Sequence, residues 1–225
     1  MHGEHISRRY DSELEAVRAL LLKMGGLVEQ QIRLATEALF SGDVNQLTAV
    51  IEGDYQVNKL EMEIDEMCSQ IIARRQPAAS DLRELMVVGR ACTDLERMGD
   101  AAKKIARLGQ QLAKLNPLYQ PNYRELKRVS ALARTMLSRV LDAFARHDLD
   151  LAQGIVRQDD EVDNEYRTVM RHLVAYMIDD PRAISTSLEI LFIAKAFEQI
   201  GDHARSIAQQ LVYLVNGRDG RISSE

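Results

Sequence analysis

Two short acidic motifs are the part of this sequence best suited to chemistry. Glu96 and Asp100 stand four residues apart with a glycine just before the aspartate, and Glu198 and Asp202 repeat the arrangement. On a helix this spacing stacks both carboxylates on one face, at a cost of a few tenths of a kcal/mol. An interior glycine costs about 1 kcal/mol relative to alanine. Because the chain carries both costs twice, we expect each motif to supply half of a cation site.

A second row of polar residues precedes each motif. The earlier row is Asp54, Asn58, Glu61 and Asp65, and the later one is Asp159 and Asp163. Spacings of three or four residues place each row on one helical face, and an adjacent antiparallel helix would bring it toward its motif. Oxygen-only ligation favours magnesium, manganese, calcium or ferric iron over copper or structural zinc. The predicted metal ligands are therefore Asp54, Asn58, Glu61, Glu96, Asp100, Asp159, Asp163, Glu198 and Asp202.

The same residues have a simpler interpretation as solvated acidic faces. Salt bridges to neighbouring basic residues would then neutralise them, each contributing little; the candidates near the first motif are Arg97, Lys103, Lys104 and Arg107. Repetition of the motif favours a site over this alternative. For Gly99 and Gly201 two roles stay open: they allow close packing of helices, or they lie near a bound metal, and both can hold. His203 points away from Glu198 and is predicted to be a surface residue rather than a ligand.

The elements that must position these residues are long helices. Apolar residues recur at helical spacing over about 10–40, 43–75, 80–115, 123–146 and 149–178, and after Pro181 as far as about Val215. All four prolines fall between these segments. Asp43 is placed to cap the second helix, and Gly25-Gly26 is a candidate kink in the first.

The six helices form two copies of one unit. Asp43, Asp54 and Val57 align with Asp148, Asp159 and Val162 at one offset, and the residues from Leu95 to Ala106 align with those from Phe197 to Ala208 after a small deletion. We therefore predict an all-α protein of two tandem three-helix bundles, six long antiparallel helices in total, related by internal duplication. The predicted boundary lies in the proline-containing stretch 116–122, giving units 1–116 and 117–225.

Composition narrows the class of protein. Hydrophobic residues make up 46% of the 225 residues but aromatic residues only 5%, a balance typical of helical proteins. The formal charge of −5 argues against nucleic acid as the main partner. Cys68 and Cys92 lack CxxC spacing and are predicted to be reduced, buried thiols. The longest apolar run is too short to span a bilayer, so we expect a soluble, cytoplasmic protein.

The sequence contains no recognisable catalytic grouping. A phosphate-binding GxxxxGK[ST] loop, a GxSxG nucleophile motif and a cysteine with a convincing histidine partner are all absent from the printed sequence. An ExxH pair of the ferritin type is absent as well. We therefore predict a protein that is not an enzyme.

The order of these motifs resembles the PhoU family, whose signature is two three-helix repeats carrying E(D)xxxD motifs. The likeness covers nearly the whole chain, from Asp11-Ser12-Glu13-Leu14 through both acidic motifs. It implies a cytoplasmic negative regulator of the phosphate-starvation response that forms homodimers. It also implies an adaptor between the ATPase subunit of an ABC phosphate transporter and a sensor histidine kinase, so that any association with the membrane is through partners. Some members bind iron or zinc clusters through these motifs.

Two departures from the family pattern concern the first site. Asn58 replaces an acid, and the asparagine of the family's GDHAxNIA motif is Lys104 in one repeat and Ser206 in the other. Repulsion from Lys104 is expected to weaken metal binding there, so the second site is the stronger candidate. Two alternative functions stay open: a metal-dependent phosphohydrolase, and an accessory protein of a low-affinity phosphate permease.

Overall fold

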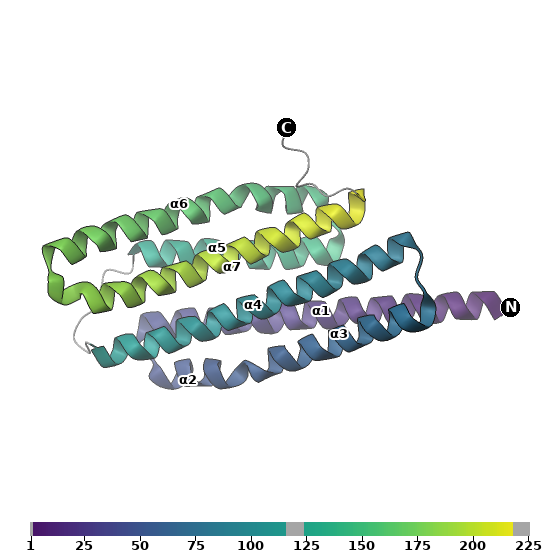
Figure 1. Cartoon of the computed structure of the whole chain (residues 1–225), viewed down its shortest axis with the longest axis horizontal. Helices are drawn as coiled ribbons and strands as arrows, with labels where there is room; N and C mark the ends of the chain where they lie inside the picture. Colours follow the sequence, from purple (N-terminus) through teal and green to yellow (C-terminus); the bar gives the residue numbers. More distant parts are fainter. Residues whose placement is uncertain (1, 116–123, 218–225) are drawn as a thin grey trace.

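A computed structural model describes residues 2–115 and 124–217, almost all of which are helical (Figure 1). The predicted linker and C-terminal tail lie outside the described residues. In chain order the elements are α1 (His2–Ser41), α2 (Val44–Gly53), α3 (Tyr55–Arg75), α4 (Ala79–Leu115), α5 (Arg124–Arg146), α6 (Leu149–Asp179), the 3-10 turn η1 (Pro181–Ala183) and α7 (Ile184–Asn216). The described part of the chain contains no strand, which confirms the predicted all-α class.

The second helix differs from the prediction because it is broken at Asp54 into α2 and α3. Its counterpart in the second half, α6, is continuous. Gly53 precedes the break, whereas the equivalent position in α6 holds Gln158. Glycine is a poor helix former, and Asp54 turns its carboxylate into the protein. The break therefore falls at a residue of the predicted site.

The turns before α2 and α6 repeat one another. Asp43 accepts a hydrogen bond from the backbone N–H of Gln46 at 3.0 Å, and Asp148 accepts one from Leu151 at 2.9 Å. Each cap satisfies an N–H that the first turn of the helix cannot pair internally. The preceding residue is left-handed in both turns. The predicted cap at Asp43 is confirmed, and its copy marks the start of α6.

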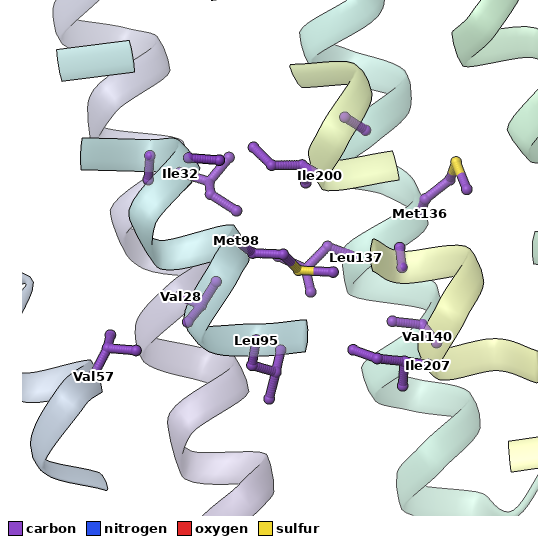
Figure 2. Packing of buried hydrophobic residues seen from close by; sticks show 14 of the residues in the cluster. Val28, Ile32, Val57, Leu95, Met98, Met136, Leu137, Val140, Ile200 and Ile207 are labelled. Atoms are coloured by element: carbon purple, nitrogen blue, oxygen red, sulfur yellow. The ribbon is translucent and has the colours of Figure 1, made fainter. Parts of the chain in front are cut away.

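Two three-helix bundles lie side by side, the first made of α1, α2–α3 and α4 and the second of α5, α6 and α7 (Figure 1). They meet chiefly through α4 and α7, with α1 against α5. Buried apolar residues of both bundles form one continuous core. Figure 2 shows Met98 of α4 reaching toward Leu137 of α5. The division into 1–116 and 117–225 stays a prediction, because the core does not separate there.

Glycine in α1 serves the contact between bundles. The helix continues through Gly25-Gly26 without interruption, so the pair does not end it. A Cβ on Gly25 would lie 2.3 Å from Cδ2 of Leu141 in α5, whereas one on Gly26 would have no neighbour within 4 Å. The absence of a side chain at Gly25 is what lets α1 and α5 approach.

Both cysteines are reduced and buried, as predicted. Burial raises the pKa of the Cys68 thiol to about 11 and that of Cys92 to about 12. Such thiols are poor nucleophiles at neutral pH because little thiolate forms. Within the described ranges, no helix combines the length and hydropathy that a bilayer crossing requires.

Candidate metal centres

The first acid cluster, defined as Asp54, Glu61, Glu96 and Asp100, forms where the α2–α3 break faces α4. Asp54 is only 3% exposed. Lys103 Nζ lies 2.5 Å from Oδ2 of Asp54 and 3.9 Å from Oδ1 of Asp100. A lysine therefore sits among the predicted ligands and neutralises the most buried of them.

Electrostatic coupling shows that the α3 row and the α4 motif face one another. Burial raises the pKa of Glu96, and the charges of Asp100, Glu61 and Asp54 and a hydrogen bond with Asp100 raise it further. The pKa of Glu61 is raised by burial and then by Asp65 and Asp100. Repulsion between carboxylates has this effect at close range. Four of the five ligands predicted in this half are therefore close enough to act on one another electrostatically.

Asn58, the fifth, has no hydrogen-bond partner for its side chain within the described residues. It is partly exposed on α3. Its link to the acid cluster is through the backbone, where its N–H donates to the carbonyl oxygen of Asp54 at 3.3 Å.

The second acid cluster, defined as Asp159, Asp163, Glu198 and Asp202, repeats this arrangement between α6 and α7. Arg205 donates to Asp159 and its Nη2 lies 3.0 Å from Oδ1 of Asp202. Asp163 pairs with Arg167 of its own helix at 3.4 Å, which directs part of its charge outward. Arg205 therefore bridges one buried ligand, Asp159, and one partly exposed ligand, Asp202.

Glu198 has a separate partner. Lys195 Nζ lies 2.5 Å from its Oε1, while Oε2 is buried without a hydrogen-bond partner among the described residues. Burial raises the pKa of Glu198; Lys195 opposes this shift and Asp202 and Asp163 add to it. An orphaned carboxylate oxygen is a group that a bound cation would satisfy.

Asp159 carries the largest perturbation of the cluster. Burial raises its pKa to about 6; Arg205 opposes the shift, and Asp202, Asp163 and Asp160 add to it. Like-charge neighbours make the ionised form costly even with a guanidinium beside it. Strongly shifted carboxylates of this kind are common at functional sites.

Sequence reasoning identified only one of the two basic partners, because Lys103 was among the cations expected near the first motif and Arg205 was not expected. Aligning Glu96 with Glu198 makes Lys103 and Arg205 equivalent, and each pairs with the buried aspartate of its bundle. The expected weakening of the first site by Lys104 stays a prediction; Lys104 is exposed and lines a groove together with Lys103. Both cations stand three residues after the motif aspartate, and this i, i+3 spacing was the signal that could have identified Arg205 as well.

The donors fit a hard cation, but only with rearrangement. In the described parts of the chain no three His, Cys, Asp or Glu side chains are already grouped as a metal site. Lys103 and Arg205 would have to turn outward, which the 39% exposure of the Arg205 side chain permits. The oxygen-only donors and the orphaned oxygen of Glu198 favour the second cluster.

Gly99 and Gly201 serve close packing in both bundles. A Cβ on Gly99 would meet Cγ1 of Val57 at 3.4 Å, and one on Gly201 would meet Cγ1 of Val162 at 3.2 Å. Oδ1 of Asp54 would be 3.7 Å from the added Cβ at Gly99. The motif glycine therefore lets the helix carrying the motif approach the helix carrying the partner row.

His203 belongs to a polar contact between the bundles rather than to the open surface. Its Nδ1 lies 3.0 Å from Oδ1 of Asp94, and Nε2 of Gln210 donates to Oδ2 of the same aspartate at 2.8 Å. The His203 side chain is 21% exposed and that of Asp94 10%. The prediction of a surface histidine was wrong because only tertiary packing places α4 beside that side of α7.

The fold and its paired clusters define a class of protein: all-helical, built from two copies of a three-helix bundle, with carboxylates collected where the second helix of each copy meets the third. Comparison with known proteins agrees with this description. The family model described as the PhoU domain matches the sequence of this chain twice, over residues 21–109 and 126–211.

Similar proteins extend over nearly the whole chain. A Pseudomonas aeruginosa protein named phosphate-specific transport system accessory protein PhoU homolog is 47% identical, over 96% of this chain and 89% of its own. The Escherichia coli K12 accessory protein PhoU is 44% identical over 97% and 90%. The crystal structure of PhoU from P. aeruginosa superposes with a TM-score of 0.89, covering 93% of this chain and all of the other. For the Streptococcus pneumoniae regulatory protein PhoU the TM-score is 0.86 at 30% identity. The chain belongs to the PhoU family.

Proposed function

We propose that this protein is an accessory and regulatory component of a phosphate-specific transport system. In the finer form of the proposal it is a cytoplasmic negative regulator of the phosphate-starvation response. It would act as an adaptor between the transporter ATPase and a sensor histidine kinase, and it would not be an enzyme. The observation that carries the proposal is similarity along nearly the full chain to proteins named for that system.

An adaptor needs binding surfaces rather than a catalytic site, and the names of the relatives mention no reaction. Both points support the proposal that the protein is not an enzyme.

The shape of the molecule supports this role. One apolar core runs through both bundles, so the helices form a stiff body that can hold separate surfaces at fixed positions. The formal charge of −5 favours protein partners over nucleic acid. We propose a homodimer that reaches the membrane only through its partners. The link to the kinase and the repression of starvation genes go beyond the relatives' names.

Metal binding is the second part of the proposal. We infer that the second acid cluster holds a multivalent cation, with Asp159, Asp163, Glu198 and Asp202 as ligands, and that the first cluster holds one more weakly. Iron, zinc, manganese and magnesium are the candidates. The cation would supply positive charge that braces α6 against α7. The residues of this chain supply the carboxylate oxygens and, through Gly201, the close approach of the two helices.

Deletion of the gene tests the regulatory role. We expect phosphate-starvation genes to be expressed in phosphate-replete cells of the deletion strain. Affinity capture from replete and starved cells should recover the transporter ATPase or the kinase. A deletion strain with normal repression would refute the negative regulator, and capture of a permease instead would favour the accessory role at a low-affinity transporter.

Elemental analysis tests the metal. The double variant Glu198→Ala/Asp202→Ala should lose bound metal while its helicity, measured by circular dichroism, stays unchanged. Equal metal content in the two proteins would count against the site. Phosphatase turnover by metal-loaded protein that Glu198→Ala abolishes would favour the phosphohydrolase instead.

A further inference from the structure

A groove of about 600 Å³ lies where α4 faces α7, within the size range of small-molecule sites. Four of its lining residues are basic and come from α4, and two neutral polar residues come from α7. They are Arg97, Lys103, Lys104, Arg107, Gln199 and His203. Asp100 is the single carboxylate in the lining. The groove is therefore strongly positive on a protein whose formal charge is −5.

Most of this positive charge is free to act on a ligand. Arg97, Lys104 and Arg107 are exposed, and within the described residues none of them pairs with a carboxylate. Cations gathered in a concave site repel one another and raise the local concentration of anions. The groove is therefore expected to be more stable with an anion bound than with water alone.

The duplicated helix shows that the fold does not need these charges. When Glu96 is aligned with Glu198, the positions of α7 that are equivalent to the three exposed cations of α4 hold neutral residues. These residues are Gln199, Ser206 and Gln209. Both helices pack in the same way within their bundles. The basic residues of α4 are therefore an addition to one copy, and packing gives no reason for them.

Polar groups complete the wall on the α7 side. Asp94 accepts from Nδ1 of His203 at 3.0 Å, which fixes the ring, so Nε2 donates to an anion only when the imidazole is doubly protonated. Gln199 adds an amide. Arginine forks and lysine ammonium groups are the usual partners of phosphate oxygens, and their hydrogen bonds to a charged acceptor are the strong ones.

We propose that this groove binds an anion carrying two or more linked phosphoryl groups. A single orthophosphate is too small and too weakly charged to engage cations spread from Arg97 to Arg107, about 15 Å along the helix axis. Linked phosphoryl groups carry more charge than orthophosphate and offer oxygens to several of these cations at once. Inorganic polyphosphate and the triphosphate of a nucleotide share this chemistry.

Lys103 connects the groove to the first acid cluster, since it lines the groove and pairs with Asp54. An anion in the groove competes for its ammonium group. Anion binding and the charge balance around Asp54 are therefore coupled through one side chain.

Isothermal titration of the purified full-length chain tests the proposal in metal-free, low-salt buffer, because pyrophosphate and nucleotides chelate metals. The probes are orthophosphate, sulfate, pyrophosphate, triphosphate and ATP. The test variant is Lys104→Gln/Arg107→Gln, and the matched control Lys59→Gln/Arg157→Gln removes two exposed charges elsewhere. Thermal unfolding by circular dichroism confirms that both variants fold.

We expect triphosphate to bind more tightly than orthophosphate and sulfate, and the test variant to bind it roughly tenfold or more weakly. The control should bind like the wild type. Equal binding of ATP and triphosphate would assign the phosphate chain as the ligand, and tighter binding of ATP would add a contact to the base. No binding at millimolar triphosphate, or equal loss in the test and control variants, would overturn the proposal. The assay needs no partner protein, so its failure is distinct from failure of the regulatory role.

Discussion

In the first acid cluster a single lysine, Lys103, faces both Asp54 and Asp100, whereas in the second Arg205 faces Asp159 and Asp202. The second cluster has a further cation at Glu198, and its partner helix is unbroken. Three carboxylates of each cluster occupy equivalent positions, whereas Glu61 aligns with Tyr166 and Asp163 aligns with Asn58. The cations and the backbone around the carboxylates also differ. The duplication therefore preserved an acidic framework and changed how each copy is neutralised.

The two copies also differ in the faces with which α4 and α7, the helices that carry the acidic motifs, lie against each other. The helix α4 presents basic residues to the groove, and the equivalent positions of α7 are neutral. Two copies of one unit thus supply unequal halves of a shared surface. The comparison can be tested by changing matched residues in the two bundles.

Removal of the bridging cation should have the largest effect. Lys103→Met leaves the carboxylate of Asp54 buried without its partner, and we expect a loss of about 3 kcal/mol in the free energy of unfolding. Arg205→Met should cost less, about 1–2 kcal/mol, because Arg205 is more exposed and its pairing is screened by water. Urea unfolding of both variants measures the difference. A larger loss for Arg205→Met than for Lys103→Met would contradict this difference between the two clusters.

The acidity of Asp159 should give the second bundle a pH dependence. Its pKa is raised from 3.8 to about 6 in the folded protein, so between these values the folded chain binds more protons than the unfolded chain. The free energy of unfolding contributed by this group therefore rises as the pH falls from above 6 toward 4, by roughly 2–3 kcal/mol. Urea unfolding at several pH values measures it.

Asp159→Asn should remove this part of the pH dependence, and the exposed neighbour Asp160 supplies the control as Asp160→Asn. Glu61, Glu96 and Glu198 also have raised pKa values and keep their contribution in both variants. Identical pH profiles for the wild type and Asp159→Asn would show that the carboxylate is not perturbed.

Metal affinity should rise when the cations are removed. Lys103→Gln and Arg205→Gln each delete a positive charge that competes with a metal for the same carboxylates, and we expect each to strengthen manganese binding about tenfold. Competition titration with a fluorescent chelator gives the affinities. Unchanged affinity in both variants would mean that these cations already lie clear of the bound metal.

Alanine at the motif glycines should have the smallest effect. The nearest neighbour of an added Cβ is 3.4 Å away at Gly99 and 3.2 Å at Gly201, where stiff Val162 must give way. Helix propensity gains about 1 kcal/mol at each position. Gly99→Ala should therefore be neutral or slightly stabilising, and Gly201→Ala less favourable by less than about 1 kcal/mol. Thermal melts of the two variants provide the comparison.

The sequence by itself determined the helices, the duplication and the acidic residues, because helical periodicity, caps and repeat spacing are local properties of the chain. It also placed Glu61 near Glu96, since adjacent antiparallel helices leave few registers. The break at Asp54 was missed because Gly53 in one helix and Gln158 in another differ by a propensity too small to decide a boundary.

Only the tertiary structure decided which cation meets which carboxylate. Lys103 and Lys104 are neighbours in the chain and both line the groove, yet only Lys103 pairs with Asp54, because helical rotation separates their side chains. The contact of His203 with Asp94 and the groove itself depend on how α4 lies against α7. Such pairings join residues far apart in sequence, and packing of the two bundles fixes them.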